Sequence, residues 1–212
     1  MKPLAECRLY TFIDTAFVRG RPLGELAHQL CEGGSDLIQL RAKNASADEV
    51  RKMAEQVLPV TRAAGVRLVI NDFLEVAAAV GADACHLGQE DFFDAGHRRV
   101  SEVRLGAMLV GLSTHGPGDA ARALAAGADY LGVGPVFPTG TKPEAQPVTL
   151  EYVRWAAKNV TIPWFAIGGI HLGNIDQVLE AGAKGICAVS AILNSPDVAA
   201  ACREFRIRMG IA

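Results

Sequence analysis

The stretch Ala64-Gly65-Val66-Arg67-Leu68-Val69-Ile70-Asn71-Asp72 contains the pattern that decides the fold. A helical run ends at a glycine, which supplies the left-handed conformation that closes a helix. The apolar run that follows has no polar alternation, as expected for a parallel strand covered on both faces. Polar residues come directly after that strand. The stretch therefore predicts a helix, a turn, a buried strand and a polar strand end, in that order.

The same turn recurs at Val80-Gly81-Ala82, Ala126-Gly127-Ala128 and Ala181-Gly182-Ala183. Eight strand–helix units in a row predict an α/β protein with a single-domain (β/α)8 TIM barrel over residues 1–212. An open doubly wound sheet is the alternative, but the count of eight and the lack of a glycine-rich dinucleotide turn after the first strand favour the barrel. The predicted strands are 9–13, 36–40, 67–70, 83–87, one within 105–112, 129–133, 163–167 and 184–189, and the predicted helices include 47–64, 118–126, 150–159, 175–181 and 197–209.

The charge balance and the cysteines exclude several classes of protein. The 21 Lys and Arg against 23 Asp and Glu give a net charge of −2, which argues against a nucleic acid or an anionic membrane as the main partner. No apolar run approaches the roughly twenty residues that span a bilayer. The five cysteines are odd in number and lack the two-residue spacing of a zinc or redox motif, which predicts a cytoplasmic protein without disulfides.

Two aspartates stand at the ends of neighbouring predicted strands, where barrels of this kind carry their active sites. Asp72 and Asp91 can converge there, and a pair of carboxylates without zinc-type ligands suits Mg²⁺, which also takes phosphate oxygens and water. Either aspartate alone is better explained as a helix cap. The pair at adjacent strand ends favours a magnesium site.

Three cations surround the same predicted mouth. Arg41 and Lys43 lie two residues apart after the second strand, and Lys142 lies in the long loop over residues 135–148. Together they could clamp a diphosphate, with arginine acting as a fork and lysine as a point charge. A solvated charge cluster is the alternative. The segment Thr139-Gly140-Thr141-Lys142 offers hydroxyls and backbone N–H groups to a phosphate or to a closing loop, or is a plain turn.

A second anion site is predicted at the last two strands. Gly168-Gly169-Ile170 and Val189-Ser190-Ala191 follow strands seven and eight, where such barrels often bind a monophosphate. Ser113 is interpreted as a hydrogen-bond donor to an anion, because no histidine–acid pair can be assigned to activate it. His86 is expected to be a core histidine, and the role of His115 stays open. Two anion subsites suggest an enzyme that joins two phosphorylated substrates, with a diphosphate as leaving group.

The motifs at these strand ends resemble the thiamine phosphate synthase family, in the family's order and over almost the whole chain. The resemblance implies a transferase that moves a hydroxymethylpyrimidine group from its diphosphate to the nitrogen of a thiazole phosphate by a dissociative substitution, in thiamine biosynthesis. The motifs are Gln39-Leu40-Arg41-Ala42-Lys43, Asn71-Asp72, His86-Leu87-Gly88-Gln89-Glu90-Asp91, Ser113-Thr114-His115, the run from Gly132 to Lys142, and Ile167-Gly168-Gly169-Ile170.

The resemblance also implies roles for particular residues. The cofactor is Mg²⁺, held by Asp72 and Asp91, and no side chain acts as a nucleophile. Ser113, Lys142 and Arg41 are the predicted catalytic residues. The pyrimidine diphosphate is assigned to Gln39, Arg41, Lys43, Asn71, Ser113 and Lys142, and the thiazole phosphate to Thr139, Gly140, Thr141, Gly169, Val189 and Ser190. The oligomeric state stays open, a homodimer included.

The sequence departs from the family pattern in two places. Ala84-Cys85 replaces a glycine and an aliphatic residue, and Val148-Thr149 stands where a glycine is expected after the long loop, which could alter loop closure. Two alternatives to the synthase remain. One is a thiazole tautomerase-like isomerase, against which Asp91 and residues 139–142 argue. The other is a non-catalytic protein that binds thiamine precursors, which would not need a pair of metal-binding aspartates.

Overall fold

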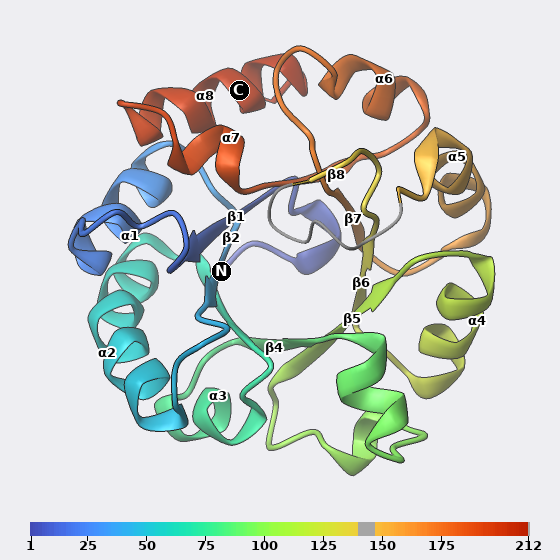
Figure 1. Cartoon of the computed structure of the whole chain (residues 1–212), viewed down its shortest axis with the longest axis horizontal. Helices are drawn as coiled ribbons and strands as arrows, with labels where there is room; N and C mark the ends of the chain where they lie inside the picture. The colour runs from blue at the N-terminus through green and yellow to red at the C-terminus, as the bar shows by residue number, and fades with distance from the viewer. Residues whose placement is uncertain (140–146, 212) are drawn as a thin grey trace.

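In the described part of the chain, eight parallel strands pair in chain order, and β1 also pairs with β8 to close a barrel. The structure is a computed structural model and describes residues 1–139 and 147–211. Figure 1 looks along the barrel and shows the helices as an outer ring. The predicted fold class is confirmed, and the open sheet is wrong. The strands are β1 (Leu9–Asp14), β2 (Leu37–Arg41), β3 (Arg67–Asn71), β4 (Ala84–Leu87), β5 (Leu109–Thr114), β6 (Tyr130–Val133), β7 (Trp164–Ile167) and β8 (Gly185–Ala188).

Helices connect successive strands, except that β4 and β5 are joined through short helical turns. Among the described residues, each helix is too short or too polar to cross a lipid bilayer. The α-helices are α1 (Leu23–Glu32), α2 (Ala47–Ala64), α3 (Leu74–Val80), α4 (Pro117–Ala126), α5 (Thr149–Asn159), α6 (Ile175–Glu180), α7 (Ser190–Leu193) and α8 (Val198–Arg208), and the short turns are η1 (Leu4–Glu6), η2 (Glu90–Asp94) and η3 (Val100–Glu102).

Local sequence signals set the ends of these elements. Ser46 and Glu49 form a reciprocal capping box at the start of α2, which satisfies backbone N–H groups that the first turn leaves unpaired. The predicted glycine turns close α2, α3 and α4 with left-handed residues, whereas α6 is capped by Ala181, one residue before its glycine. The predicted fifth strand is partly wrong. A turn at Gly106 (φ 65°) delays its start to Leu109, so that Ser113 lies within the strand and not after it.

Aromatic side chains fill the middle of the barrel. The rings of Tyr10, Tyr130 and Phe165 are buried, with centroids 5.2 to 6.2 Å apart and near-perpendicular planes. Gly111 on β5 makes room for this layer, since a Cβ there would lie 2.1 Å from Cζ of Tyr130. The barrel is therefore a packed core and not a pore.

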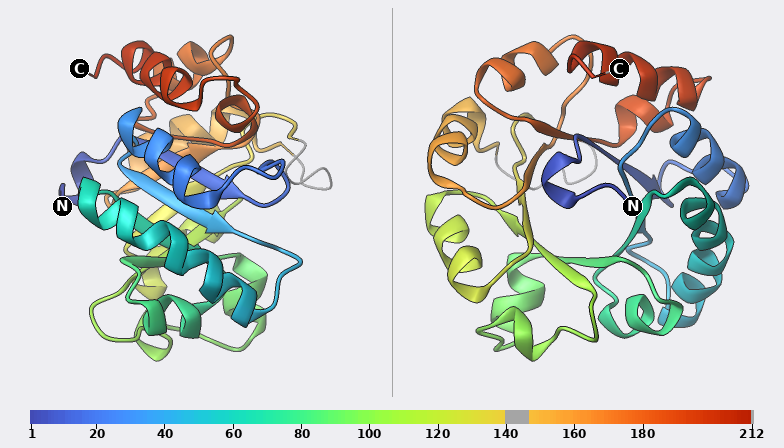
Figure 2. Two further views of the ribbon diagram at one scale, coloured as in Figure 1. Left: turned by 90° about the vertical axis from the view of Figure 1, so that its left-hand side faces the viewer. Right: turned by 180° about the vertical axis from the view of Figure 1, so that it is seen from behind.

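The N-terminal segment covers one end of the barrel. Figure 2 shows η1 over the middle of the ring in the right-hand view, at the end away from the strand arrowheads in the left-hand view. Lys2 holds this segment in place, because its carbonyl oxygen accepts a hydrogen bond from Arg67 and its Nζ lies 3.0 Å from Asp36 Oδ1. The N-terminal segment therefore lies across the end of the barrel that is opposite to the carboxyl ends of the strands.

Candidate active site

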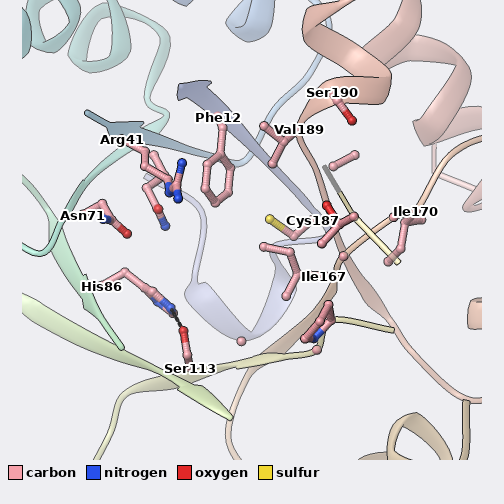
Figure 3. A pocket seen from close by; sticks show the side chains of 18 of the residues that line it. Phe12, Arg41, Asn71, His86, Ser113, Ile167, Ile170, Cys187, Val189 and Ser190 are labelled. Atoms are coloured by element: carbon pink, nitrogen blue, oxygen red, sulfur yellow. Dashed lines mark hydrogen bonds between the residues drawn. The ribbon is translucent and has the colours of Figure 1, made fainter. Parts of the chain in front are cut away.

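A pocket of about 820 Å³, open mouth included, lies at the carboxyl ends of the strands. In Figure 3, Arg41, Asn71 and Ser113 face it from one side, and Val189 and Ser190 from the other. The lining residues are Phe12, Gln39, Arg41, Asn71, His86, Ser113, His115, Gly132, Gly134, Pro135, Thr139, Ile167, Gly168, Gly169, Ile170, Cys187, Ala188, Val189 and Ser190.

A buried ion pair holds Arg41 at the pocket. Its Nη1 donates to Oδ2 of Asp14 at 2.6 Å, and the side chains of Arg41 and Asp14 are only 11% and 2% exposed. The two residues end β2 and β1 and are partners in the strand register. Sequence analysis missed Asp14, although a charge at the end of an apolar strand was an available signal. The carboxylate orients the guanidinium that would meet an anionic substrate.

Lys43 lies outside the pocket lining and beside Asp72. Its Nζ is 3.4 Å from Oδ2 of Asp72, and Nδ2 of Asn71 donates to the same oxygen at 2.6 Å. Asp72 has φ of 67°, and the hydrogen bond from Phe73 N–H to Asn71 O (2.9 Å) closes a three-residue turn around it. Asp and Asn tolerate this conformation better than most residues. The turn keeps the Asp72 carboxylate next to a pocket residue.

The second predicted metal ligand, Asp91, stands in η2, just after β4. Its Oδ2 accepts from Gly88 N–H at 3.3 Å, so the carboxylate turns back toward the strand end. Asp72 N–H donates to His86 O on that strand. Among the described residues, no group of three or more His, Cys, Asp or Glu side chains is arranged so that it could hold a metal ion without other ligands. Two carboxylates at neighbouring strand ends, completed by water and phosphate oxygens, fit the needs of Mg²⁺.

Ser113 and His86 form a hydrogen-bonded pair in the pocket. Nε2 of His86 lies 3.0 Å from Oγ of Ser113 (Figure 3), and Nδ1 of His86 lies 3.3 Å from the Tyr130 hydroxyl. The expectation of a core histidine is wrong, because His86 lines the pocket; its place one residue before the end of β4 was the available signal. Gln89 also contacts Ser113, because its Nε2 donates to the Ser113 carbonyl oxygen at 2.5 Å.

The loop after β7 packs too closely on the segment after β6 for any residue larger than glycine. A Cβ on Gly168 would lie 2.4 Å from Cβ of Pro135, and one on Gly169 would lie 2.5 Å from the carbonyl oxygen of Pro138. Both glycines have positive φ, and Nδ2 of Asn174 donates to Gly169 O at 2.9 Å. The loop is therefore held in one shape against the pocket.

Val189 and Ser190 bring the start of α7 to the same side of the pocket, and Thr139 lines it as well. The first N–H groups of a helix have no partner within the helix, so they are available to an anion. The structure thus brings together these three residues and Gly169, four of the six residues that sequence analysis assigned to the thiazole phosphate. The other two, Gly140 and Thr141, lie outside the described residues.

Lys142 also lies outside the described residues, so its predicted catalytic role stays a prediction. His115, left open by the sequence, lines the pocket. Its Nδ1 is 2.5 Å from Gly134 O, and its N–H donates to Oδ2 of Asp119 at 2.9 Å. His115 therefore ties the end of β5 to the end of β6.

Fold and pocket together define the class of protein: a (β/α)8-barrel enzyme with groups suited to anion binding at the carboxyl ends of its strands. Residues 9–192 match the sequence model of the thiamine monophosphate synthase family. The chain belongs to this family, which confirms the resemblance seen in its motifs and the prediction of a transferase.

Individual relatives agree with this assignment. The thiamine-phosphate synthase of Thermus thermophilus is 49% identical over 182 residues, which cover 85% of this chain and 86% of the relative. That of Chloroflexus aurantiacus is 41% identical over 209 residues, covering 98% and 95%. The solved thiamine phosphate pyrophosphorylase of Pyrococcus furiosus superposes with a TM-score of 0.87 at 33% identity, covering 99% of this chain and 98% of that one.

Proposed function

We propose that the protein is a thiamine phosphate synthase that works in the cytoplasm. It transfers the hydroxymethylpyrimidine group from its diphosphate to the nitrogen of a thiazole phosphate, and it releases thiamine phosphate and diphosphate. Family membership supports the reaction, and the reduced state of the five cysteines, all of them in described residues, supports the location.

One observation carries the proposal: a single pocket is lined by two sets of anion-binding groups on opposite sides. Arg41 and Asn71 stand on one side, and Val189 and Ser190 stand on the other. A diphosphate and a monophosphate bound there would bring the two substrates together in the space between them. Holding two reactants in contact removes most of the entropic cost of a bimolecular step.

The groups around Arg41 suit a departing diphosphate. The Arg41 guanidinium can bind two phosphate oxygens at once, and Lys43 adds a positive charge beside Asp72. When bound at Asp72 and Asp91, Mg²⁺ would neutralise charge on the diphosphate. The carbon–oxygen bond to the diphosphate breaks, and the thiazole nitrogen supplies the new electron pair. Accordingly, we assign no side chain as nucleophile, and Ser113 acts as a hydrogen-bond donor.

A coupling assay tests the reaction. Purified protein receives the pyrimidine diphosphate, the thiazole phosphate and Mg²⁺, and thiamine phosphate is measured with and without EDTA. We expect product that disappears when EDTA removes the metal. Folded protein that makes no product would overturn the proposal, and isomerisation of a thiazole carboxylate phosphate would support the tautomerase-like alternative instead.

The aspartate pair is tested by Asp91→Ala, with Asp94→Ala as the matched control. Both aspartates lie in the same short turn η2, and the Asp91 carboxylate accepts a hydrogen bond from Gly88 N–H at the end of β4. Loss of a ligand to the metal should lower kcat/KM by about 100-fold or more, whereas Asp94→Ala should keep the wild-type rate. Equal turnover in the two variants would contradict the assignment of Asp91 as a metal ligand.

A further inference from the structure

A continuous chain of hydrogen bonds crosses the barrel interior and ends in the pocket at Ser113. Nε2 of Gln39 lies 2.5 Å from the Tyr10 hydroxyl, which lies 3.3 Å from the Tyr130 hydroxyl. The Tyr130 hydroxyl lies 3.3 Å from Nδ1 of His86, and Nε2 of His86 lies 3.0 Å from Oγ of Ser113. The members come from five different strands, and both tyrosines and Gln39 are buried.

All hydrogen bonds in this series run in the same donor-to-acceptor direction, and Gln39 sets that direction. The Gln39 amide nitrogen can only donate, so the Tyr10 oxygen accepts and its own hydrogen is left for Tyr130. If Tyr130 accepted from both Tyr10 and His86, its hydrogen would have no acceptor among the hydroxyl's contacts in the described residues. A buried O–H group without an acceptor is costly. Tyr130 therefore donates to Nδ1 of His86.

The hydrogen bond from Tyr130 sets the tautomer of the His86 imidazole, which contacts Ser113 in the pocket. A neutral histidine carries its single hydrogen on one nitrogen, so a hydrogen bond accepted at Nδ1 leaves that hydrogen on Nε2. Nε2–H then donates to the Ser113 oxygen. The hydroxyl hydrogen of Ser113 is thereby free to point to a ligand.

We propose, on the basis of the proposed function, that Tyr10 and Tyr130 are positioning residues that hold His86 as the Nε2–H tautomer and make Ser113 a hydrogen-bond donor to the pyrimidine substrate. Ser113 would then select a substrate with an acceptor atom, a ring nitrogen or a diphosphate oxygen, at this place in the pocket. The two tyrosines do not contact the substrate themselves and act on it through His86 and Ser113.

Packing and burial keep both hydroxyls in their donor state. The Tyr130 ring sits over Gly111, 5.5 Å from the His86 ring, and is fully buried. Burial also raises the pKa values of Tyr10 and Tyr130, since a phenolate would lose its hydration. Both residues consequently keep their hydrogens at neutral pH, as the directional chain requires.

The tautomer can be measured without any activity. Nitrogen-15 NMR of the histidine side chains separates Nε2–H, Nδ1–H and the doubly protonated form, and a His86→Gln variant assigns the signal. We expect His86 to be Nε2–H in the wild type and to lose that preference in Tyr130→Phe. A wild-type His86 in the Nδ1–H or the doubly protonated form would overturn the proposal.

Kinetics test the effect on substrate, with Tyr152→Phe as the matched control. Tyr152 is also buried, and its hydroxyl donates to Oγ1 of Thr114 at 2.6 Å, outside the chain. Tyr130→Phe should lower kcat/KM for the pyrimidine diphosphate about fivefold to tenfold, the size of one lost hydrogen bond, while Kd for the thiazole phosphate and all parameters of Tyr152→Phe stay near wild type. Equal losses in both variants would indicate a purely structural role and contradict the proposal.

A double variant shows whether the tyrosine acts through Ser113. In a Ser113→Ala background, Tyr130→Phe should cause no further loss of kcat/KM, because the group that it positions is gone. Additive losses would overturn the proposed route. A wild type that is inactive but holds His86 as Nε2–H would contradict the proposed function and leave the tautomer assignment supported, so the two failures are distinguishable.

Discussion

At the residue scale, the non-glycine residues with positive φ in the described part of the chain are Arg19, Asp72 and Thr149, and the last two bear on the predicted site. Asp72 has φ of 67° and Thr149 has φ of 62°. Strained backbone of this kind often accompanies function. For Asp72 the turn places a carboxylate next to Asn71 and Lys43. Thr149 stands where the family pattern predicts glycine. Its conformation is unfavourable for threonine, because a β-branched residue rarely adopts positive φ.

Thr149→Asn should therefore stabilise the protein. Asn tolerates the left-handed conformation, and it can replace the Thr149 hydroxyl that accepts from Glu151 N–H at 3.3 Å. We expect a gain of about 1 kcal/mol in the free energy of unfolding, measured by urea titration. Thr149→Val keeps the strain and loses the acceptor, so it should be less stable than wild type. The strain explanation fails if both variants change stability in the same direction.

The ion pair between Arg41 and Asp14 should matter both for stability and for the substrate binding that we propose for Arg41. Arg41→Ala should cost about 3 kcal/mol in unfolding free energy, because it leaves a buried carboxylate unpaired. Adding Asp14→Asn removes that charge and should restore part of the stability but none of the activity. Urea titration measures the free energy of unfolding, and the coupling assay measures the activity. A double variant no more stable than Arg41→Ala would contradict it.

At the scale of elements, the loop after β7 and the segment after β6 form one braced unit. Ile167 O accepts from Val136 N–H at 2.9 Å, and Gly168 O accepts from Phe137 N–H at 3.1 Å. The backbone around Gly169, which we propose binds the thiazole phosphate, is consequently held in place by the segment after β6 as well as by Asn174. Such preorganisation is what anion binding through backbone N–H groups needs.

Gly169→Ala should disturb this unit. Its methyl group would lie 2.5 Å from Pro138 O, in a backbone conformation that costs alanine about 1–2 kcal/mol. If that cost falls on the bound state, Kd for the thiazole phosphate rises about tenfold, which calorimetry measures. Gly173→Ala in the same loop is the control, because Gly173 has no positive φ and its new methyl group would meet only the exposed His171. Equal Kd values in the two variants would argue against the phosphate site.

At the scale of the whole molecule, the barrel shields its thiols. Cys7, Cys85, Cys187 and Cys202 are buried, and Cys31 is partly exposed. Burial raises the pKa of Cys31 to about 11 and that of Cys202 to about 12, since a buried thiolate loses its hydration. Only the thiolate reacts with disulfide reagents.

We accordingly expect slow labelling of native protein at pH 8, led by Cys31, and fast labelling of all five thiols in denaturant. The native rate should rise about tenfold per pH unit up to about pH 11, whereas thiols of the unfolded chain, with pKa near 8.5, level off earlier. Because the folded state keeps its thiol protons longer, its stability should also fall as the pH rises above about 8.5. Fast labelling of several thiols at pH 8 would contradict the shielding.

The barrel and the residues at its strand ends are determined by the sequence itself. Glycine turns, apolar runs and helical spacing are local signals, and they located all eight strands, with the fifth starting late. Parallel strands in a barrel bring their carboxyl ends to one side, so the polar residues after each strand could be predicted to share a site. Eight residues of the predicted site, from Gln39 to Ser190, do line one pocket.

Only the tertiary structure decided how the site is supported. Asp14 pairs with Arg41 across 27 positions of sequence, and Tyr10 meets Tyr130 across 120. The structure also places His86, which the sequence predicted to be a core residue, in the lining of the pocket. These contacts join side chains that become neighbours only when the barrel closes, because burial and the direction of each side chain depend on packing against distant strands and not on the local pattern.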